Sequence, residues 1–243
     1  IRNHQNINTH SEWVRAAVQR INKNAKKYET ARSLRNEFSL AEKWNLETCT
    51  RYRLFTSTSS IISYKGLHVL IDALALLVND FPTLQLNIAS NITQGIRRDG
   101  YTRYLFKKIR KLGLNDNIKW LGPLTAQELI NELLASNVAV VPSFVESYCV
   151  ALNEAIFLGV PTVASFAGAM SELGKHHETV SFFQIGDAGM CANEIKKIFE
   201  DDQKALKLSR GALNSGLLEQ NNNAVQGQIG IYRDLLEQEV GIM

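Results

Sequence analysis

Glycine and proline are missing from the first 65 residues of this 243-residue chain, because all 15 glycines and all 4 prolines lie at or after Gly66. The first fifty-odd residues therefore differ in composition from the remainder. Their lack of helix-breaking residues favours a mostly helical segment. Ser11 fits the cap of a helix whose apolar positions, Trp13, Ala17 and Ile21, recur every four residues.

Cysteines and long apolar runs are also scarce. The three cysteines, Cys49, Cys149 and Cys191, form no CxxC pair, which excludes a disulfide scaffold and predicts free thiols in a reducing compartment. The runs 70–78 and 138–145 are interrupted or less than half as long as a bilayer span requires. No secretory signal opens the chain. We therefore expect a cytoplasmic globular protein, for which 45% apolar and 21% charged residues are ordinary values.

Acidic residues are few at the start of the chain. Residues 1–53 hold 11 lysines and arginines against 5 glutamates, so this segment carries +6 and the remainder −3. A solvated basic helix face is the preferred interpretation, since a membrane-surface helix needs a stronger apolar face. No nucleic-acid partner is expected, because aromatic interleaving and RNA- or DNA-binding motifs are absent. The chain begins with Ile1 rather than methionine, which predicts a fragment or a processed product.

From residue 52, short apolar runs alternate with helical patterns. This alternation is typical of a doubly wound α/β fold, with one parallel sheet of about six strands and helices on both faces. Strands are expected at 52–58, 84–89, 118–121, 138–141, 160–164 and 181–185, and helices at 66–79, 101–112, 125–134, 147–158, 187–199 and 216–239.

Several motifs of nucleotide and hydrolytic enzymes are absent. No GxGxxG follows the first strand, and neither a P-loop nor an HExxH or GxSxG motif occurs. In a doubly wound sheet the ligand lies at the carboxyl ends of the strands, so we expect a site in the loops there.

The segment 142–159 carries the strongest functional signal. A buried strand ends before it, and a helix is expected from Ser147, whose free N–H groups would form an anion site. Glu146 precedes this helix and Glu154 lies eight positions later, roughly 12 Å further along its axis. A nucleoside diphosphate sugar has a matching arrangement, with phosphates at the helix start and one sugar at each carboxylate. On spacing alone, two solvated glutamates remain the alternative.

The motifs around this segment resemble the nucleotide-sugar half of retaining glycosyltransferases of family 4, which have the two-domain GT-B fold. The resemblance extends over residues 55–200, about 60% of the chain. The matching residues are Lys65-Gly66 with Leu70 and Ala73, Ile118–Gly122, Pro142-Ser143, Glu146, Glu154-Ala155, Gly159, Pro161, Val163, Ala164, Gly168 and Glu172.

The resemblance implies a role for each matching site residue. Glu146 would be the catalytic residue that holds hydroxyls of the transferred sugar, Glu154 would bind the ribose, and Lys65 would contact the diphosphate. No metal or cofactor is expected, because a lysine and a helix dipole would stabilise the leaving group and no Asp-x-Asp occurs. The remaining implied donor-binding residues are Ser147, Tyr148, Cys149 and Val150, whose backbone would cradle the phosphates, and Gly122, which would border the base.

The chain departs from the family pattern at three places. Where the family has Gly-Arg before the lysine, this chain has Ser59-Ser60, so one cation is missing. We expect Ser60 and the hydroxyl-rich run before it to supply hydrogen-bond donors instead. Cys149 replaces a glycine and is expected to narrow the pocket, and Ser90 replaces another glycine after the second central strand.

The resemblance divides the chain into a remnant of an acceptor domain with its linker (1–50), a nucleotide-sugar-binding Rossmann-like domain (51–216) and a helix that crosses back (217–243). It implies sugar transfer from a nucleotide sugar with retention of configuration, in polysaccharide or glycoconjugate synthesis. The acceptor, a glycan or a lipid-linked glycan, would bind through the missing domain, with peripheral contact at the inner face of the membrane.

Two other functional classes remain open for this chain. One is a nucleotide-sugar-binding module without turnover. The other is a GT-B nucleotide-sugar epimerase, which is expected to have an acid/base histidine, whereas none occurs at 146–154.

Overall fold

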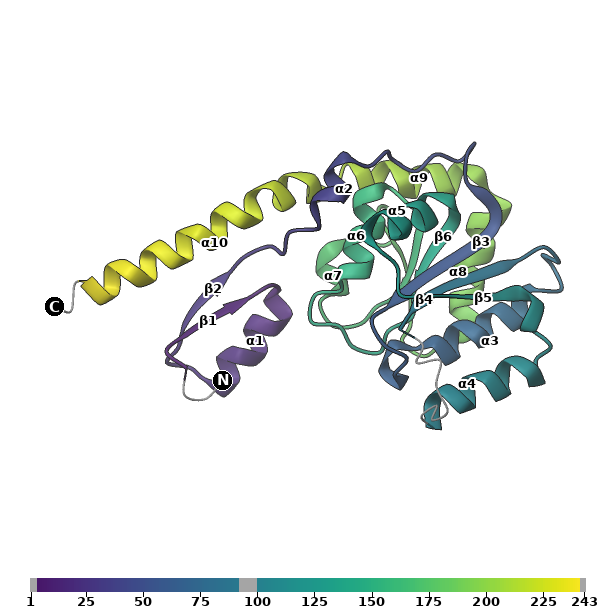
Figure 1. Cartoon of the computed structure of the whole chain (residues 1–243), viewed down its shortest axis with the longest axis horizontal. Coiled ribbons are helices and arrows are strands. Elements are labelled where there is room, and N and C mark those ends of the chain that lie inside the picture. The colour runs from purple at the N-terminus through teal and green to yellow at the C-terminus, as the bar shows by residue number, and fades with distance from the viewer. Residues whose placement is uncertain (1–3, 92–99, 241–243) are drawn as a thin grey trace.

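The structure is a computed structural model that describes residues 4–91 and 100–240. Its main body is a parallel sheet of six strands in the order β5-β4-β3-β6-β7-β8, covered by helices on both faces, which confirms the predicted fold class (Figure 1). The strands are β3 (Thr50–Thr58), β4 (Gln85–Ser90), β5 (Ile118–Gly122), β6 (Ser136–Val141), β7 (Thr162–Ser165) and β8 (Ser181–Phe183).

The central strands are buried on both faces because helices cover both sides. Every residue of β6 and β7 is buried, as expected for parallel strands in a doubly wound sheet. The covering helices are α3 (Leu67–Leu77), α4 (Gly100–Lys111) and α8 (Ala188–Glu200) on one face, and α2 (Asn36–Leu40), α5 (Ala126–Ala135) and α6 (Val150–Leu158) on the other.

Two of the predicted helices begin where expected, each with a side-chain cap. Thr125 and Glu128 form a complete capping box at the start of α5, and the Asp187 side chain accepts a hydrogen bond at the start of α8. Two further helices were not anticipated: the four-residue α7 (Met170–Leu173), and α9 (Asp202–Leu213), which packs against α6 and α8.

Residues 4–30 form a small unit of their own. Strands β1 (Asn6–Thr9) and β2 (Lys26–Glu29) pair in parallel, and α1 (Glu12–Ile21) connects them, with Ser11 as its N-cap as predicted. The expectation of a mostly helical segment 1–50 is therefore wrong. β2 was missed because its residues, Lys-Lys-Tyr-Glu, lack the apolar alternation of a strand.

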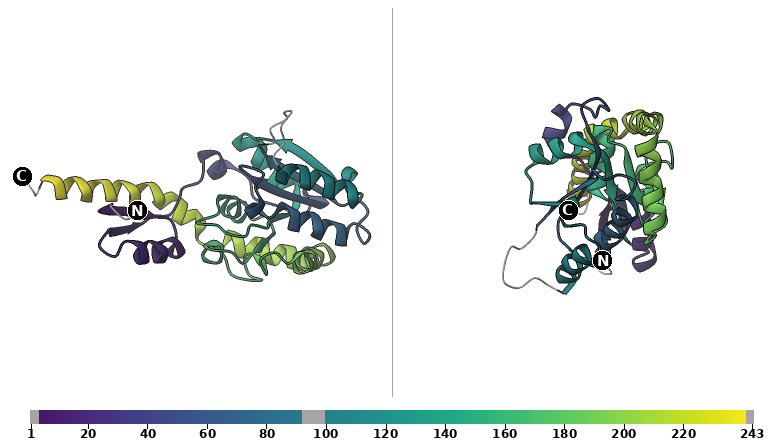
Figure 2. Two further views of the ribbon diagram at one scale, coloured as in Figure 1. Left: turned by 90° about the horizontal axis from the view of Figure 1, so that it is seen from below. Right: turned by 90° about the vertical axis from the view of Figure 1, so that its right-hand side faces the viewer.

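The last helix, α10 (Leu217–Val240), extends away from the sheet and lies alongside this N-terminal unit (Figures 1 and 2). Lys26 Nζ and the Tyr28 hydroxyl both contact the Asp234 carboxylate of α10, at 2.6 and 2.5 Å. The last three residues of the predicted crossing helix, 241–243, lie outside the described range. No helix in the described ranges is long and apolar enough to cross a membrane.

The order of the strands reverses between β3 and β6. The chain runs outward from β3 through β4 to β5, then returns to β6 on the other side of β3 and continues to β7 and β8. Ligands of doubly wound sheets bind beside such a reversal, at the carboxyl ends of the two strands concerned. Here those ends are Thr58 and Val141.

Candidate functional site

A cavity of about 650 Å³ opens at the carboxyl ends of β3 and β6. Eight of the nine predicted site residues line it: Lys65, Gly122, Glu146, Ser147, Tyr148, Cys149, Val150 and Glu154. The ninth, Ser60, does not, and its carbonyl accepts a hydrogen bond from the hydroxyl of Thr58 at 2.9 Å. Its neighbours Thr56–Ser59 do line the cavity, so the hydroxyl-rich run contributes without Ser60.

The Glu146 carboxylate is held in a fixed orientation. Lys65 Nζ and Ser143 Oγ both donate to its Oε1 atom, each at 2.7 Å. The side chain of Glu146 is only 11% exposed, so this ion pair is better shielded from water than a surface pair. Its Oε2 atom has no hydrogen-bond partner among the described residues and is available to a ligand hydroxyl.

The backbone behind Glu146 is clamped by a neighbouring loop. The Ala169 N–H donates to the Glu146 carbonyl at 2.9 Å, and Gly168, at φ +56°, lies directly against the same carbonyl. A Cβ atom at position 168 would lie 2.2 Å from that oxygen, so only glycine permits this approach. The close approach to the Glu146 carbonyl thereby explains the glycine of the sequence motif.

Helix α6 begins at Val150, three residues later than predicted. Cys149 has φ +71° and ψ +78°, a left-handed conformation that cannot continue into a right-handed helix. Glu146 therefore lies on the loop before α6, as predicted. This loop extends to Cys149, so the predicted spacing of roughly 12 Å, which uses the helical rise from Glu146 onward, does not apply. The start of α6 has no side-chain cap, so the first N–H groups of the helix remain available to an anion in the cavity.

The Cys149 side chain is buried beside the cavity that this residue lines. It packs into an apolar cluster with Val141, Leu152 and Ile156, and only 5% of the residue is exposed. The position requires positive φ, which accounts for the glycine that the family pattern has there.

Burial, and secondarily the Glu146 carboxylate, raises the pKa of the Cys149 thiol to about 12. Because the thiolate is the reactive species, native Cys149 is expected to react with iodoacetamide at pH 8 about a thousandfold more slowly than the unfolded chain. Alkylation followed by peptide mass spectrometry, with and without urea, measures this ratio. Equal rates in both conditions would show that the thiol is accessible and ionised in the native fold.

Glu154 lies in the second turn of α6 and is 5% exposed. Burial raises the pKa of its carboxyl, and Arg35 opposes this with its charge and with a hydrogen bond from Nη2 to Oε1 at 3.1 Å. Arg35 belongs to the linker between β2 and α2, which sequence reasoning did not connect with the site. No motif or periodicity in that linker indicated it.

The linker makes a second contact with residues 142–149, the loop between β6 and α6 that the sequence predicts to bind the donor and that we call the donor loop. The Tyr148 hydroxyl donates to the Arg32 carbonyl at 3.3 Å and accepts from Asn153 Nδ2 at 2.8 Å. The Tyr148 ring also meets His10 edge-on, at 6.2 Å between centroids. Both Arg32 and Arg35 line the cavity, which therefore receives residues from the linker as well as from the sheet.

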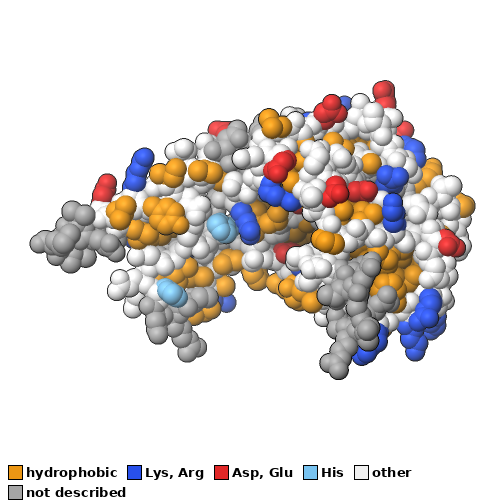
Figure 3. All heavy atoms as spheres, in the orientation of Figure 1, with side chains coloured by type: hydrophobic (Ala, Val, Ile, Leu, Met, Phe, Trp, Pro, Cys, Tyr) orange, Lys and Arg blue, Asp and Glu red, His pale blue; other side chains and the backbone are white. Residues whose placement is uncertain are grey.

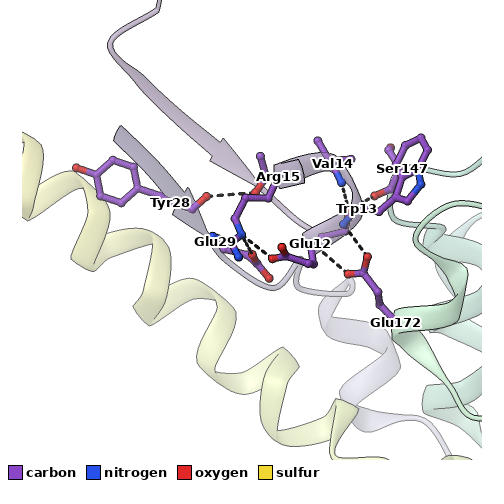
Figure 4. A network of polar contacts seen from close by, with 10 residues as sticks. Glu12, Trp13, Val14, Arg15, Tyr28, Glu29, Ser147 and Glu172 are labelled. Atoms are coloured by element: carbon purple, nitrogen blue, oxygen red, sulfur yellow. Dashed lines mark hydrogen bonds and ion pairs between the residues drawn. The ribbon is translucent and has the colours of Figure 1, made fainter. Parts of the chain in front are cut away.

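The N-terminal unit contacts the donor loop directly (Figure 4). Ser11 Oγ donates to the Ser147 carbonyl at 2.6 Å. The Glu172 carboxylate accepts the free N–H groups of Glu12 and Trp13, at 2.8 and 2.7 Å. Glu172, noted in the sequence as part of a Gly-x-x-x-Glu element, thus stabilises the positive start of α1.

In the space-filling view the surface is hollowed between the N-terminal unit and the sheet body, where basic and acidic side chains lie close together (Figure 3). Within the cavity the pairs are Lys65 with Glu146 and Arg35 with Glu154. Paired carboxylates beside free helix N–H groups are suited to a ligand that carries both hydroxyls and phosphates.

Comparison with curated proteins gives distant relatives. The chain is 27% identical to D-inositol 3-phosphate glycosyltransferase of Corynebacterium efficiens over 151 residues, which are 62% of this chain and 35% of that protein. It is also 27% identical to Protein CapJ of Staphylococcus aureus over 129 residues, which are 53% of this chain and 31% of that protein. The chain thus spans about a third of the length of these curated relatives.

Solved structures share the fold. Sucrose-phosphate synthase from Thermosynechococcus elongatus superposes with a TM-score of 0.82 at 21% identity, covering 98% of this chain and 60% of that one. Anabaena HepE in complex with UDP-glucose superposes with a TM-score of 0.77 at 20% identity, covering 93% of this chain and 64% of that one.

The model of the family "Glycosyl transferases group 1" matches residues 40–215, which include β3 to β8 and every cavity-lining residue except Arg32 and Arg35. The match covers well over half of the chain and agrees with the fold and with the motif positions that line the cavity. This chain belongs to the group 1 glycosyltransferase family.

Proposed function

We propose that this chain is the donor-binding half of a retaining glycosyltransferase that uses a nucleotide sugar. The observation that carries the proposal is the uncapped start of α6 between two shielded carboxylates, with Glu146 Oε2 free on one side and Glu154 on the other. The diphosphate would lie at the helix start, the transferred sugar at Glu146 and the ribose at Glu154. Transfer to a glycan or lipid-linked acceptor, with peripheral membrane contact, belongs to the same proposal.

A thermal-shift titration tests donor binding. Anabaena HepE has been solved with UDP and with UDP-glucose, so UDP, UDP-glucose and GDP are the first probes. A ligand present at a hundredfold excess over its dissociation constant should raise the unfolding midpoint by about 5 °C or more, since it stabilises only the folded chain. Inorganic phosphate at equal ionic strength is the control. If no nucleoside diphosphate or nucleotide sugar shifts the midpoint, the proposed function is wrong.

We further propose that donor binding needs no divalent metal, because Lys65 and the α6 N-terminus supply the positive potential that the diphosphate requires. The same titration in EDTA should give an unchanged shift. A shift that disappears in EDTA and returns with Mg²⁺ would contradict the metal-free site.

Turnover must be measured on the intact protein, since the chain spans about a third of its relatives. Sugar transfer that retains the anomeric configuration, as observed by NMR of the product, would support the proposed glycosyltransferase activity. Donor binding without any turnover would instead favour a nucleotide-sugar-binding module.

A further inference from the structure

The cavity holds three cations, and two of them are already paired. Lys65 contacts Glu146 at 2.7 Å and Arg35 contacts Glu154 at 3.1 Å. Arg32 also lines the cavity, and its guanidinium has no carboxylate partner within residues 4–91 and 100–240. Arg32 is therefore the cavity cation whose charge the described part of the protein leaves uncompensated.

Arg32 is placed close to the start of α6. Its carbonyl accepts the Tyr148 hydroxyl at 3.3 Å, and Tyr148 lies two residues before Val150, where the helix begins. The positive charge of Arg32 also acts on that hydroxyl: burial raises the pKa of Tyr148, whereas Arg32 opposes the rise through its backbone bond and its charge. The Arg32 charge thus acts at the Tyr148 hydroxyl, which also accepts a hydrogen bond from Asn153 of α6 and belongs to a residue that lines the cavity.

A nucleoside diphosphate brings at least two negative charges to this place. The helix start and Lys65 supply part of the compensation, but Lys65 is shared with Glu146. The position where the family pattern has a second cation is Ser60, which neither carries charge nor lines the cavity. An arginine suits the missing role, because its planar fork binds phosphate oxygens in pairs.

We propose that Arg32, from the linker, is the second cationic ligand of the donor diphosphate and replaces the arginine that the family pattern places at position 60. The proposal rests on the proposed function, since it assigns a ligand to the same donor site. In this chain, the linker before the sheet would supply a phosphate contact that the family pattern places in the loop after β3.

The test compares Arg32→Ala with Arg20→Ala, which removes the same charge from an exposed position of α1 outside the cavity. Calorimetry with UDP measures binding of the whole nucleotide, and competition with millimolar uridine measures binding of the nucleoside alone. The difference between the two gives the contribution of the phosphates. Arg32→Ala should weaken UDP binding roughly 10- to 100-fold, as expected for loss of a charge-assisted hydrogen bond, and leave uridine binding unchanged. Arg20→Ala should change neither, and Arg32→Lys should lose less than Arg32→Ala because it keeps the charge.

The possible failures are distinguishable. If the unmodified chain binds no nucleoside diphosphate, the proposed function falls and this assignment falls with it. If the unmodified chain binds UDP and Arg32→Ala binds it equally well, only the assignment of Arg32 is overturned. Equal losses of UDP and uridine in Arg32→Ala would likewise overturn it, since the effect would then not depend on phosphate. An unchanged urea unfolding curve confirms that the variant is folded.

Discussion

Replacing Glu146 with alanine is expected to leave nucleoside diphosphate binding intact or strengthened, whereas replacing Glu154 with alanine should weaken it roughly 10- to 100-fold. Glu146 faces the transferred sugar in the proposed donor orientation, and its removal frees Lys65 from an ion pair at 2.7 Å. Glu154 faces the ribose, which both the diphosphate and the complete donor contain. The complete donor should therefore lose affinity in both variants.

Calorimetry with UDP and UDP-glucose on each variant gives the comparison, and Glu146→Gln is the matched control that keeps the shape of the side chain. In the intact enzyme, both Glu146 variants should also lower the rate of transfer. Equal weakening of UDP by the Glu146 and Glu154 variants would show that the donor does not lie along α6 in the proposed direction. No effect from either variant, with the fold intact, would leave two glutamates without a role in donor binding.

Gly66→Ala should have the largest effect on stability. Gly66 follows Lys65 at φ +72°, and a Cβ atom there would lie 1.9 Å from the carbonyl oxygen of Pro142. Left-handed strain and steric overlap with a backbone atom act together, so we expect a loss of about 3–5 kcal/mol in the free energy of unfolding. The overlap also forces apart the two loops that bring Lys65 and Glu146 together, so UDP-glucose binding should fall with stability.

Gly113→Ala is the matched control for Gly66→Ala. Gly113 has nearly the same angle, φ +71°, but no atom lies within 4 Å of the position its Cβ would occupy. It should therefore lose only the conformational component, about 1–2 kcal/mol, and keep the donor affinity. Urea denaturation of both variants measures the difference. Equal losses in the free energy of unfolding would mean that overlap with the Pro142 carbonyl does not add to the destabilisation of Gly66→Ala.

The fold could be predicted from the sequence because its signals are local. Thr125 with Glu128 marks the start of α5 through a capping box, and the six strands are marked by short apolar runs separated by helical patterns. The motif residues were also found, because they occur in the order and at the spacing of the family pattern. Lys65, Glu146 and Glu154 line one cavity as expected, and their separate roles stay predictions.

The remainder depends on contacts between segments far apart in the chain. The left-handed backbone at Cys149 ends the predicted helix early, and nothing in a buried cysteine indicates positive φ. Arg32 and Arg35 reach the cavity from more than a hundred residues before Glu154. Neither belongs to a periodic pattern or a motif, so only the three-dimensional structure associates them with the site.

The contacts of Ser11 and Arg32 with the donor loop, and of Arg35 with Glu154 of α6, bear on how members of this family can be recombined. A chimera that exchanges only the sheet domain at residue 51 would separate Glu154 from its guanidinium and Ser147 from the Ser11 hydroxyl. The exchanged domain would contain every recognisable motif, but its binding site would lack these contacts. Residues 11–35 should therefore be transferred together with the domain, because residues that precede the domain line the pocket and contact its loop.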